Sequence, residues 1–273
     1  MKPSPAPTDI HPCVLTIAGS DSGGNAGVQA DLRAFHAYGL HGCTVFAALT
    51  AQNPFAVTAV HEVPADFVGA QLDAVLGVYA IRALKTGMLS SAAVIETVAA
   101  RLAGHPEIAR VIDPVMVATS GAKLISDEAI ALLKKKLLPG ATLITPNLPE
   151  AEVLVGGALD GTARAADAEH AERLARTLYD RYGAAVLVKG GHGHGTAAVD
   201  VLFDGRTCQA FPLPWIDHPV STHGTGCTLA AALAAELALG HDVATAVAGA
   251  KRYVHAAIRD SYLVGENCGV LSM

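Results

Sequence analysis

The sequence predicts an α/β fold with a central, mostly parallel sheet covered by helices on both faces. Short apolar runs rich in β-branched residues alternate with amphipathic segments along most of the 273-residue chain. Alternation of this kind is typical of parallel strands joined by helices. The chain is also 51% hydrophobic and only 16% charged, which suits one large buried core.

The expected elements follow one another from residue 14 onward. Strands are expected at 14–20, 43–51, 80–88, 110–116, 142–145 and 185–189. Helices are expected at 25–38, 66–78, 92–102, 126–138, 167–182, 227–239 and 242–260. Apolar segments at 199–203 and 208–211 predict an antiparallel hairpin at one edge of the sheet. We expect a flexible, Pro-rich tail over residues 1–12 and a single domain over 13–273.

Composition argues against several kinds of protein. The net charge of −6 gives no general attraction to nucleic acid or to an acidic membrane. The Pro-rich start has no apolar core like that of a signal peptide, and the longest apolar run, 227–239, is too short to cross a bilayer. The five cysteines are scattered and include no C-x-x-C pair, so we expect a reducing, cytoplasmic environment rather than disulfides or a zinc site.

Polar and glycine-rich segments follow most of the expected strands. They lie at 19–27, 52–54, 87–88, 113–121, 146–150 and 189–195. Because ligands of parallel sheets bind where the strands end, we expect these segments to converge on one rim and form a site. Neither G-x-G-x-x-G nor the Walker A pattern G-x-x-x-x-G-K-[ST] occurs, so phosphate has to be bound by some other element.

The best candidate for that element is the stretch STHGTGCTLAAALAA at 221–235. Gly224 and Gly226 allow the backbone to bend, and an Ala- and Leu-rich helix follows from Cys227. Free N–H groups and the positive end of the helix dipole favour an anion at such a junction, although similar turns also serve as plain connectors. A thiol at a helix start is expected to have a lowered pKa, so Cys227 is a candidate base; alternatively it only shapes the pocket.

Two other loops carry candidate phosphate or metal groups. Asn147 and Glu150 lie three residues apart at an expected helix start. An amide and a carboxylate suit a hydrated Mg²⁺, but capping of the helix explains the same pair. Lys189 follows a strand and would place a cation on the rim, close to a phosphate. His192 and His194 in the next turn are more typical of polar loop groups than of metal ligands.

Three further polar residues allow two interpretations each. Asp31 either orients the glycine loop at 18–27 or is a solvated helix charge. Asp113 either contributes to the electrostatics of the site or clamps a loop. Gln52 has a donor and an acceptor that match the edge of a heterocycle, but it is equally a polar residue at a strand end.

Taken together, these motifs resemble the hydroxymethylpyrimidine/phosphomethylpyrimidine kinases of thiamine biosynthesis, in the ribokinase-like superfamily that also includes pyridoxal kinases. The resemblance runs from about residue 14 to 263 in the family's order and spacing. Its stretches are AGSDSGGNAGVQAD at 18–31, AQN at 51–53, KTGM at 85–88, DPVM at 113–116, TPNLPE at 145–150, KGGH at 189–192 and THGTGCTL at 222–229. Asn25, Ser221, Ala230 and segment 266–269 depart from the family pattern, and Asn25 is expected to narrow the lid over the substrate.

The resemblance implies a ribokinase-like three-layer sandwich and a homodimer. It implies transfer of the γ-phosphoryl group of ATP, with Mg²⁺, to 4-amino-5-hydroxymethyl-2-methylpyrimidine and then to its monophosphate. The implied pyrimidine pocket consists of Gly19, Ala26, Gln52, Met88 and Cys227. The resemblance places Asn147, Glu150 and Lys189 at Mg-ATP, with Asn147 and Glu150 at the metal. It implies an anion hole made of Gly224, Thr225, Gly226 and Cys227. It also implies that Lys251 contacts the phosphate of the monophosphate substrate.

Other functions stay open at this point. Pyridoxal or pyridoxine kinase activity, alone or as a second activity, is the nearest alternative. A Cys-dependent hydrolase or acyltransferase would use Cys227 as nucleophile and His223 as base, independently of ATP. A non-catalytic ligand sensor would have no use for the complete set of phosphate-handling residues.

Overall fold

The computed structural model describes residues 10–116, 124–157, 168–191 and 197–273. Its strands are β1 Cys13–Asp21, β2 His41–Asn53, β3 Ala56–Glu62, β4 Ile81–Thr86, β5 Ala109–Ile112, β6 Leu143–Ile144, β7 Ala185–Val188, β8 Ala197–Phe203, β9 Cys208–Pro214, β10 Tyr262–Gly265 and β11 Cys268–Val270. Its helices are α1 Gly27–Ala37, α2 Ala65–Leu76, α3 Ala92–Leu102, α4 Asp127–Lys136, α5 Leu148–Val155, α6 Ala168–Tyr182, α7 Thr225–Ala238 and α8 Val243–Arg259, with a 3₁₀ turn, η1, at Leu138–Gly140.

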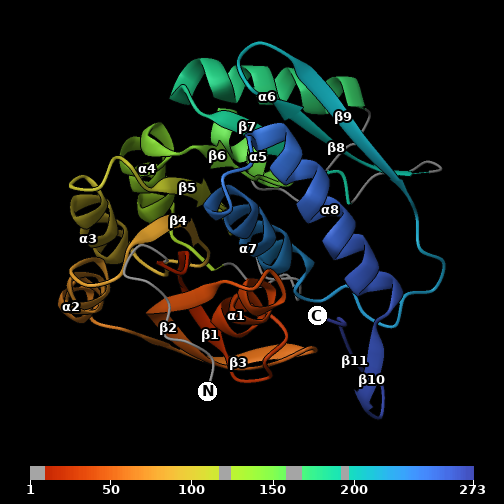
Figure 1. The fold of residues 1–273 in the computed structure, drawn as a ribbon, viewed down its shortest axis with the longest axis horizontal. Helices are drawn as coiled ribbons and strands as arrows, with labels where there is room; N and C mark the ends of the chain where they lie inside the picture. Colours follow the sequence, from red (N-terminus) through yellow and green to blue (C-terminus); the bar gives the residue numbers. More distant parts are fainter. Residues whose placement is uncertain (1–9, 117–123, 158–167, 192–196) are drawn as a thin grey trace.

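One large sheet forms the centre of the described part of the chain, in the order β3-β2-β1-β4-β5-β6-β7-β8-β9 (Figure 1). The strands from β2 to β7 in this order are parallel. β3 pairs antiparallel with β2 at one edge, and β8 and β9 are antiparallel at the other. The mostly parallel sheet and the edge hairpin are therefore confirmed.

Helices cover both faces of the sheet, as a three-layer sandwich requires (Figure 1). On one face α1, α7 and α8 pack with strand residues such as Val14 and Ala83. On the other face α2 to α6 pack with Leu15 and Ile17. Neighbouring strand residues thus point to opposite faces, and both faces are apolar, as in parallel sheets buried on two sides. None of the helices in the described segments is both long and apolar enough to cross a membrane.

Several element boundaries differ from those expected. The helix expected from 227 begins at Thr225, and the strand expected to reach 116 ends at Ile112. β3 and the small β10–β11 hairpin were not expected from the sequence, and the residues of β3 and β10 are mainly exposed. Most of the tail expected at 1–12, part of the 113–121 loop, and His192 and His194 lie outside the described residues.

A buried ion pair joins α1 to the sheet. Lys85 on β4 lies 3.0 Å from Asp31 on α1, and both side chains are fully buried. Thr16 on β1 also donates a hydrogen bond to Asp31, at 2.6 Å. Both interpretations of Asp31 from the sequence are therefore wrong. Asp31 is not a solvated helix charge, and its carboxylate pairs with Thr16 and Lys85 rather than with the glycine loop. Burial favours neutral Lys85, but the adjacent Asp31 carboxylate outweighs it and raises the pKa of Lys85.

This pair predicts a large stability effect. Lys85→Met should lower the free energy of unfolding by about 3–5 kcal/mol, because Asp31 would become an unpaired buried charge. The double variant Lys85→Met/Asp31→Asn should recover most of that loss, because the amide can still accept from Thr16. Chemical denaturation followed by circular dichroism measures both. Lys136→Met, which breaks an exposed pair with Glu96, should cost less than about 1 kcal/mol, and equal losses at Lys85 and Lys136 would contradict the prediction.

Candidate active site

A cavity of about 990 Å³ opens at the carboxyl ends of the parallel strands. This is the rim on which the sequence predicts that the polar loops converge. All of the predicted site residues line it, namely Gly19, Ala26, Gln52, Met88, Asn147, Glu150, Lys189, Gly224, Thr225, Gly226, Cys227 and Lys251. Asn25 is not among the lining residues, so the expectation that it narrows the lid finds no support in the geometry.

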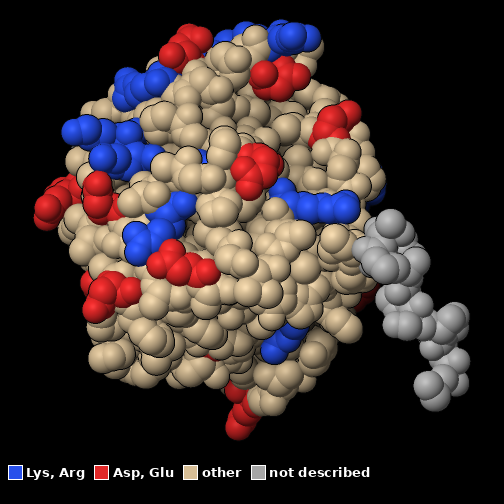
Figure 2. Space-filling view, turned by 60° about the vertical axis from the view of Figure 1, so that its left-hand side comes forward, with Lys and Arg blue, Asp and Glu red and all other residues tan. Residues whose placement is uncertain are grey.

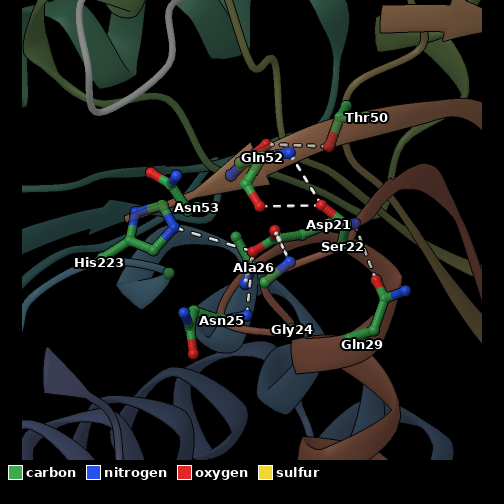
Figure 3. A network of polar contacts seen from close by, with 12 residues as sticks. Asp21, Ser22, Gly24, Asn25, Ala26, Gln29, Thr50, Gln52, Asn53 and His223 are labelled. Carbon is green, nitrogen blue, oxygen red and sulfur yellow. Dashed lines mark hydrogen bonds and ion pairs between the residues drawn. The ribbon is translucent and has the colours of Figure 1, made fainter. Parts of the chain in front are cut away.

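Asp21 holds the glycine loop in shape on one side of this cavity. Its carboxylate accepts hydrogen bonds from the backbone N–H groups of Gly23, Asn25 and Ala26, at 2.8–2.9 Å (Figure 3). Burial opposes ionisation of Asp21, but the nearby His223 ring and the hydrogen bonds from the loop amides outweigh it and lower the pKa of Asp21. Sequence reasoning missed this role, although an Asp within a glycine loop is a typical ligand of its own backbone.

The bend before α7 lies directly against that loop. Gly224 is the N-cap of α7 and has a left-handed backbone with φ 87°. A Cβ added to Gly224 would overlap the carbonyl oxygen of Asn25, so this contact requires glycine. The first N–H groups of α7 have no partners within the helix and open on the cavity, as the predicted anion hole requires.

Lys189 stands beside the anion hole, between two carboxylates. Its ammonium lies 2.8 Å from Asp113 Oδ1 and 3.9 Å from Glu150 Oε2. A Cβ placed on Gly226 would lie 3.9 Å from Lys189 Nζ and 4.0 Å from Asp113 Oδ2. Burial opposes the charge on Lys189, but Asp113 and Glu150 raise the pKa of Lys189 well above its usual range. Asp113 therefore belongs to the electrostatics of the site.

Asn147 and Glu150 form a complete capping box at the start of α5. Asn147 Oδ1 accepts from the Glu150 N–H at 2.9 Å, and Glu150 Oε2 accepts from the Asn147 N–H at 2.8 Å. Burial raises the pKa of Glu150 to about 7, an increase that Lys189 opposes and Asp113 reinforces. The capping interpretation is confirmed, and both side chains nevertheless line the cavity.

The donor set limits what kind of metal this site can hold. Among the described residues, no group of three or more His, Cys, Asp or Glu side chains could enclose an ion. Each Glu150 oxygen accepts one backbone hydrogen bond and keeps a free lone pair. This set fits a hydrated Mg²⁺ brought by phosphates, because Mg²⁺ keeps several waters and takes few protein ligands.

The expectation of a low pKa for Cys227 is wrong. Burial raises the pKa of the Cys227 thiol above its ordinary value, although the ammonium of Lys85 acts in the opposite direction. Cys227 is the third residue of α7 and is partly buried in the cavity wall, where desolvation outweighs the helix dipole. The buried ring of His223 faces Asp21 instead, with Nε2 3.9 Å from Asp21 Oδ2, and among the described residues neither ring nitrogen is within hydrogen-bond distance of a partner. A Cys–His catalytic pair is therefore not assembled.

Lys251 is held on the β8 side of the cavity. Its ammonium lies 2.9 Å from Asp200 Oδ2 and donates to the carbonyl oxygen of Ala198 at 3.0 Å. Asp200 also accepts from the N–H of Gly190, next to Lys189. These contacts place Lys251 with the lysine loop rather than with the glycine loop and Gln52. Asp200 sits on β8, the strand next to the β9 edge, and the sequence gives no signal for this role.

Comparison with known proteins agrees with this geometry. A family model described as phosphomethylpyrimidine kinase matches residues 21–272. The hydroxymethylpyrimidine/phosphomethylpyrimidine kinase of Rhizobium meliloti is 48% identical over 260 residues, which cover 93% of this chain and 94% of that protein. The chain belongs to the phosphomethylpyrimidine kinase family.

Further relatives and solved structures agree with this family assignment. A bifunctional thiamine biosynthesis protein of Geobacter sulfurreducens is 47% identical over 94% of this chain, which spans about half, 51%, of that relative's length. The Bacillus subtilis pyridoxal kinase in complex with ADP has a TM-score of 0.85 and 35% identity, with 96% of both chains covered. The phosphomethylpyrimidine kinase of Clostridium difficile 630 has a TM-score of 0.77 and 37% identity, covering 90% of this chain and 99% of that one. The fold is therefore ribokinase-like.

The remaining departures from the family pattern lie outside the cavity. Ala230 is buried in α7. Ser221 accepts a hydrogen bond from the N–H of His223. Segment 266–269 forms the turn and the start of β11 in the C-terminal hairpin, and no residue of it lines the cavity. These substitutions leave the described site intact.

The raised pKa predicts how Cys227 reacts. Carbamidomethylation of Cys227 should be slow at pH 7 and accelerate about ten-fold per pH unit beyond pH 8, because only the thiolate reacts. Peptide mass spectrometry at successive pH values measures the rate. Cys268 on the C-terminal hairpin, which is partly exposed, reports in the same sample on a thiol outside the cavity. A Cys227 rate that stays flat between pH 6 and 8 would show a thiolate at neutral pH.

Proposed function

We propose that this chain phosphorylates 4-amino-5-hydroxymethyl-2-methylpyrimidine with ATP and then converts the monophosphate to the diphosphate, in thiamine biosynthesis. Family membership supports this proposal, as do the kinase names of relatives that the chain matches over more than nine-tenths of its length. The observation that carries it is the position of Lys189 and Glu150 beside the Gly224–Gly226 bend, on one rim of the sheet.

The catalytic part of the site positions the phosphoryl group and balances its charge. The free N–H groups at the start of α7 bind the transferring group, and Lys189 offsets the negative charge between donor and acceptor. Phosphoryl transfer through a loose transition state needs little more than this. Because burial raises the pKa of the Cys227 thiol, Cys227 shapes the pocket in this proposal and is not a resting base.

A hydrated Mg²⁺ near Glu150 and Asn147 is part of the proposal. It would supply charge neutralisation for the nucleotide phosphates. Glu150 contributes a carboxylate whose remaining lone pairs face the cavity region shared with Lys189 and Asp113. Asn147 fixes the orientation of Glu150 through the capping box, so the carboxylate cannot turn away from the rim.

The ring of the acceptor is proposed to lie against the ends of β1, β2 and β4. Gly19, Ala26, Gln52 and Met88 line this part of the cavity. The Met88 side chain packs so closely on Gly19 that a Cβ there would lie 2.7 Å from Met88 Cε. Lys251 is proposed to contact a substrate phosphate from the β8 side, sharing its charge with Asp200.

We also propose a homodimer in the cytoplasm that does not bind nucleic acid or membranes. Large apolar side chains are exposed around the β2–β3 edge, including Leu49, Phe55, Val60 and Phe67. An apolar sheet edge is a typical place for a second copy to pair. On the face shown in Figure 2, acidic and basic side chains are interspersed and form no single-sign patch that would attract nucleic acid.

Pyridoxal kinase activity is a second candidate. It is favoured by the fold, because structures of pyridoxal kinases from Bacillus subtilis and Staphylococcus aureus match with TM-scores of 0.85. The phosphate-handling half of the site would serve either acceptor, since both present a hydroxymethyl group on an aromatic ring.

A product assay tests the proposed function. The purified protein with ATP and Mg²⁺ should convert the pyrimidine alcohol to its monophosphate and then to its diphosphate, resolved by ion-exchange chromatography. Pyridoxal added in equal concentration should be phosphorylated more slowly. Nucleotide left untouched with either acceptor would refute the kinase proposal, and turnover of pyridoxal alone would replace it with the second candidate.

The position of Lys189 leads to a kinetic prediction. Lys189→Met should lower kcat by about 10²–10³-fold, because the transferring group would lose its cation and face Asp113 and Glu150 unshielded. Steady-state kinetics with ATP and the pyrimidine alcohol measure the effect. Lys136→Met, on the exposed face of α4, should leave kcat unchanged. A Lys189 variant that raises only KM would mean that Lys189 binds the ground state and not the transition state.

A further inference from the structure

Two side chains at the end of β2 interact on the cavity side of the sheet. Thr50 and Gln52 are two residues apart on the strand and therefore face the same way, and both line the cavity. The Thr50 hydroxyl lies 2.8 Å from the carbonyl oxygen of Ser20 and 3.2 Å from Gln52 Oε1, so the amide is drawn with its oxygen toward Thr50 (Figure 3). Among the described residues, no protein group pairs with the other end of that amide.

The main chain of Gln52 is fixed by the glycine loop. The Ser22 hydroxyl accepts from the Gln52 N–H at 2.8 Å and donates to the Gln52 carbonyl oxygen at 2.9 Å. The root of the side chain is thus held, and Thr50 holds one end of its amide. The remaining freedom is a half-turn of the amide, which exchanges its oxygen and its NH₂ group at nearly the same positions.

Hydrogen-bond accounting decides between these two orientations. A hydroxyl has one proton, and the Ser20 carbonyl is the nearer acceptor for the proton of Thr50. If the Gln52 oxygen faces Thr50, it competes with the Ser20 carbonyl oxygen for that single proton. A Gln52 NH₂ group facing Thr50 instead donates to the free lone pair of the hydroxyl, so that both hydrogen bonds form in full.

We propose that Thr50 turns the Gln52 amide so that its oxygen faces the substrate, which makes Thr50 a specificity-determining positioning residue. This inference rests on the proposed function. Next to the reacting hydroxymethyl group, the aminopyrimidine carries an amine, which donates hydrogen bonds. Pyridoxal carries an aldehyde there, which only accepts. An amide oxygen at this place pairs with the amine and opposes the aldehyde, and a mismatched polar pair is costly once desolvated.

Equilibrium binding tests this without relying on turnover. Dissociation constants of the pyrimidine alcohol and of pyridoxal are measured by calorimetry for the wild type, Thr50→Val and Thr50→Ser. Valine keeps the shape of threonine and removes the hydroxyl, so it should weaken pyrimidine binding relative to pyridoxal binding by about five- to ten-fold. Serine keeps the hydroxyl and should retain the wild-type ratio. Thr50→Ala repeats the test if thermal melting shows that valine is not accommodated.

A matched control lies on the neighbouring strand. Thr58 on β3 donates to the carbonyl oxygen of Ala51 at 3.0 Å but does not line the cavity, so Thr58→Val should leave the ratio unchanged. Equal weakening of both ligands by Thr50→Val, or an unchanged ratio, would overturn the inference and assign Thr50 to loop stability alone. If the wild type binds both ring alcohols without phosphorylating them, the proposed function is refuted, while the ratio of the two dissociation constants still tests the role of Thr50. If the wild type binds neither compound, the proposed function and the inference about Thr50 are both overturned.

Discussion

The site depends on one main-chain contact between the glycine loop and the start of α7. At Gly224 the backbone of the bend approaches the Asn25 carbonyl so closely that any side chain would overlap it, and at Gly27 the same holds for the carbonyl of Gly19. Two walls of the cavity therefore meet through backbone alone. The loop proposed to enclose the substrate ring and the helix start proposed to bind phosphate are therefore fixed relative to each other, and a gap of even one methyl group between them would separate the ring from the phosphoryl group.

Charge in the site has to be supplied locally, because the whole chain is acidic. The structure does this with lysines that are each paired with an aspartate: Lys189 with Asp113 at the anion hole and Lys251 with Asp200 beside it. A paired lysine carries little net charge toward a nucleotide, and Glu150 adds a further acid. Lys189 alone therefore cannot balance the phosphates of ATP. Helix-start amides and a cation that arrives with the nucleotide are needed as well, which is the electrostatic reason for including Mg²⁺ in the proposed function.

Sequence reasoning located this site better than it assigned the chemistry inside it. The alternation of strands and loops placed Gln52, Glu150, Lys189 and Gly224 on one rim, because parallel strands end on the same side of a sheet. It could not show that Cys227 is desolvated, since burial depends on neighbours distant in sequence. For the same reason it left Asp31 between two wrong interpretations, because its partner Lys85 is 54 positions away. Exposed β3 has no apolar periodicity, so its pairing with β2 is visible only in three dimensions.

The cavity divides into a part that handles phosphate and a part that contacts the ring. In the proposed function, the start of α7, Lys189 and the α5 capping box carry out chemistry common to any hydroxymethyl acceptor, which agrees with the close similarity of this fold to pyridoxal kinases. Discrimination then has to come from the ends of β1, β2 and β4. β2 extends to Asn53 because β3 pairs with it there, opposite Val57 and Ala56. Val57 and Ala56 themselves line the cavity, so the start of this edge strand stiffens the strand end that carries Gln52 and forms part of the wall beside the proposed ring site.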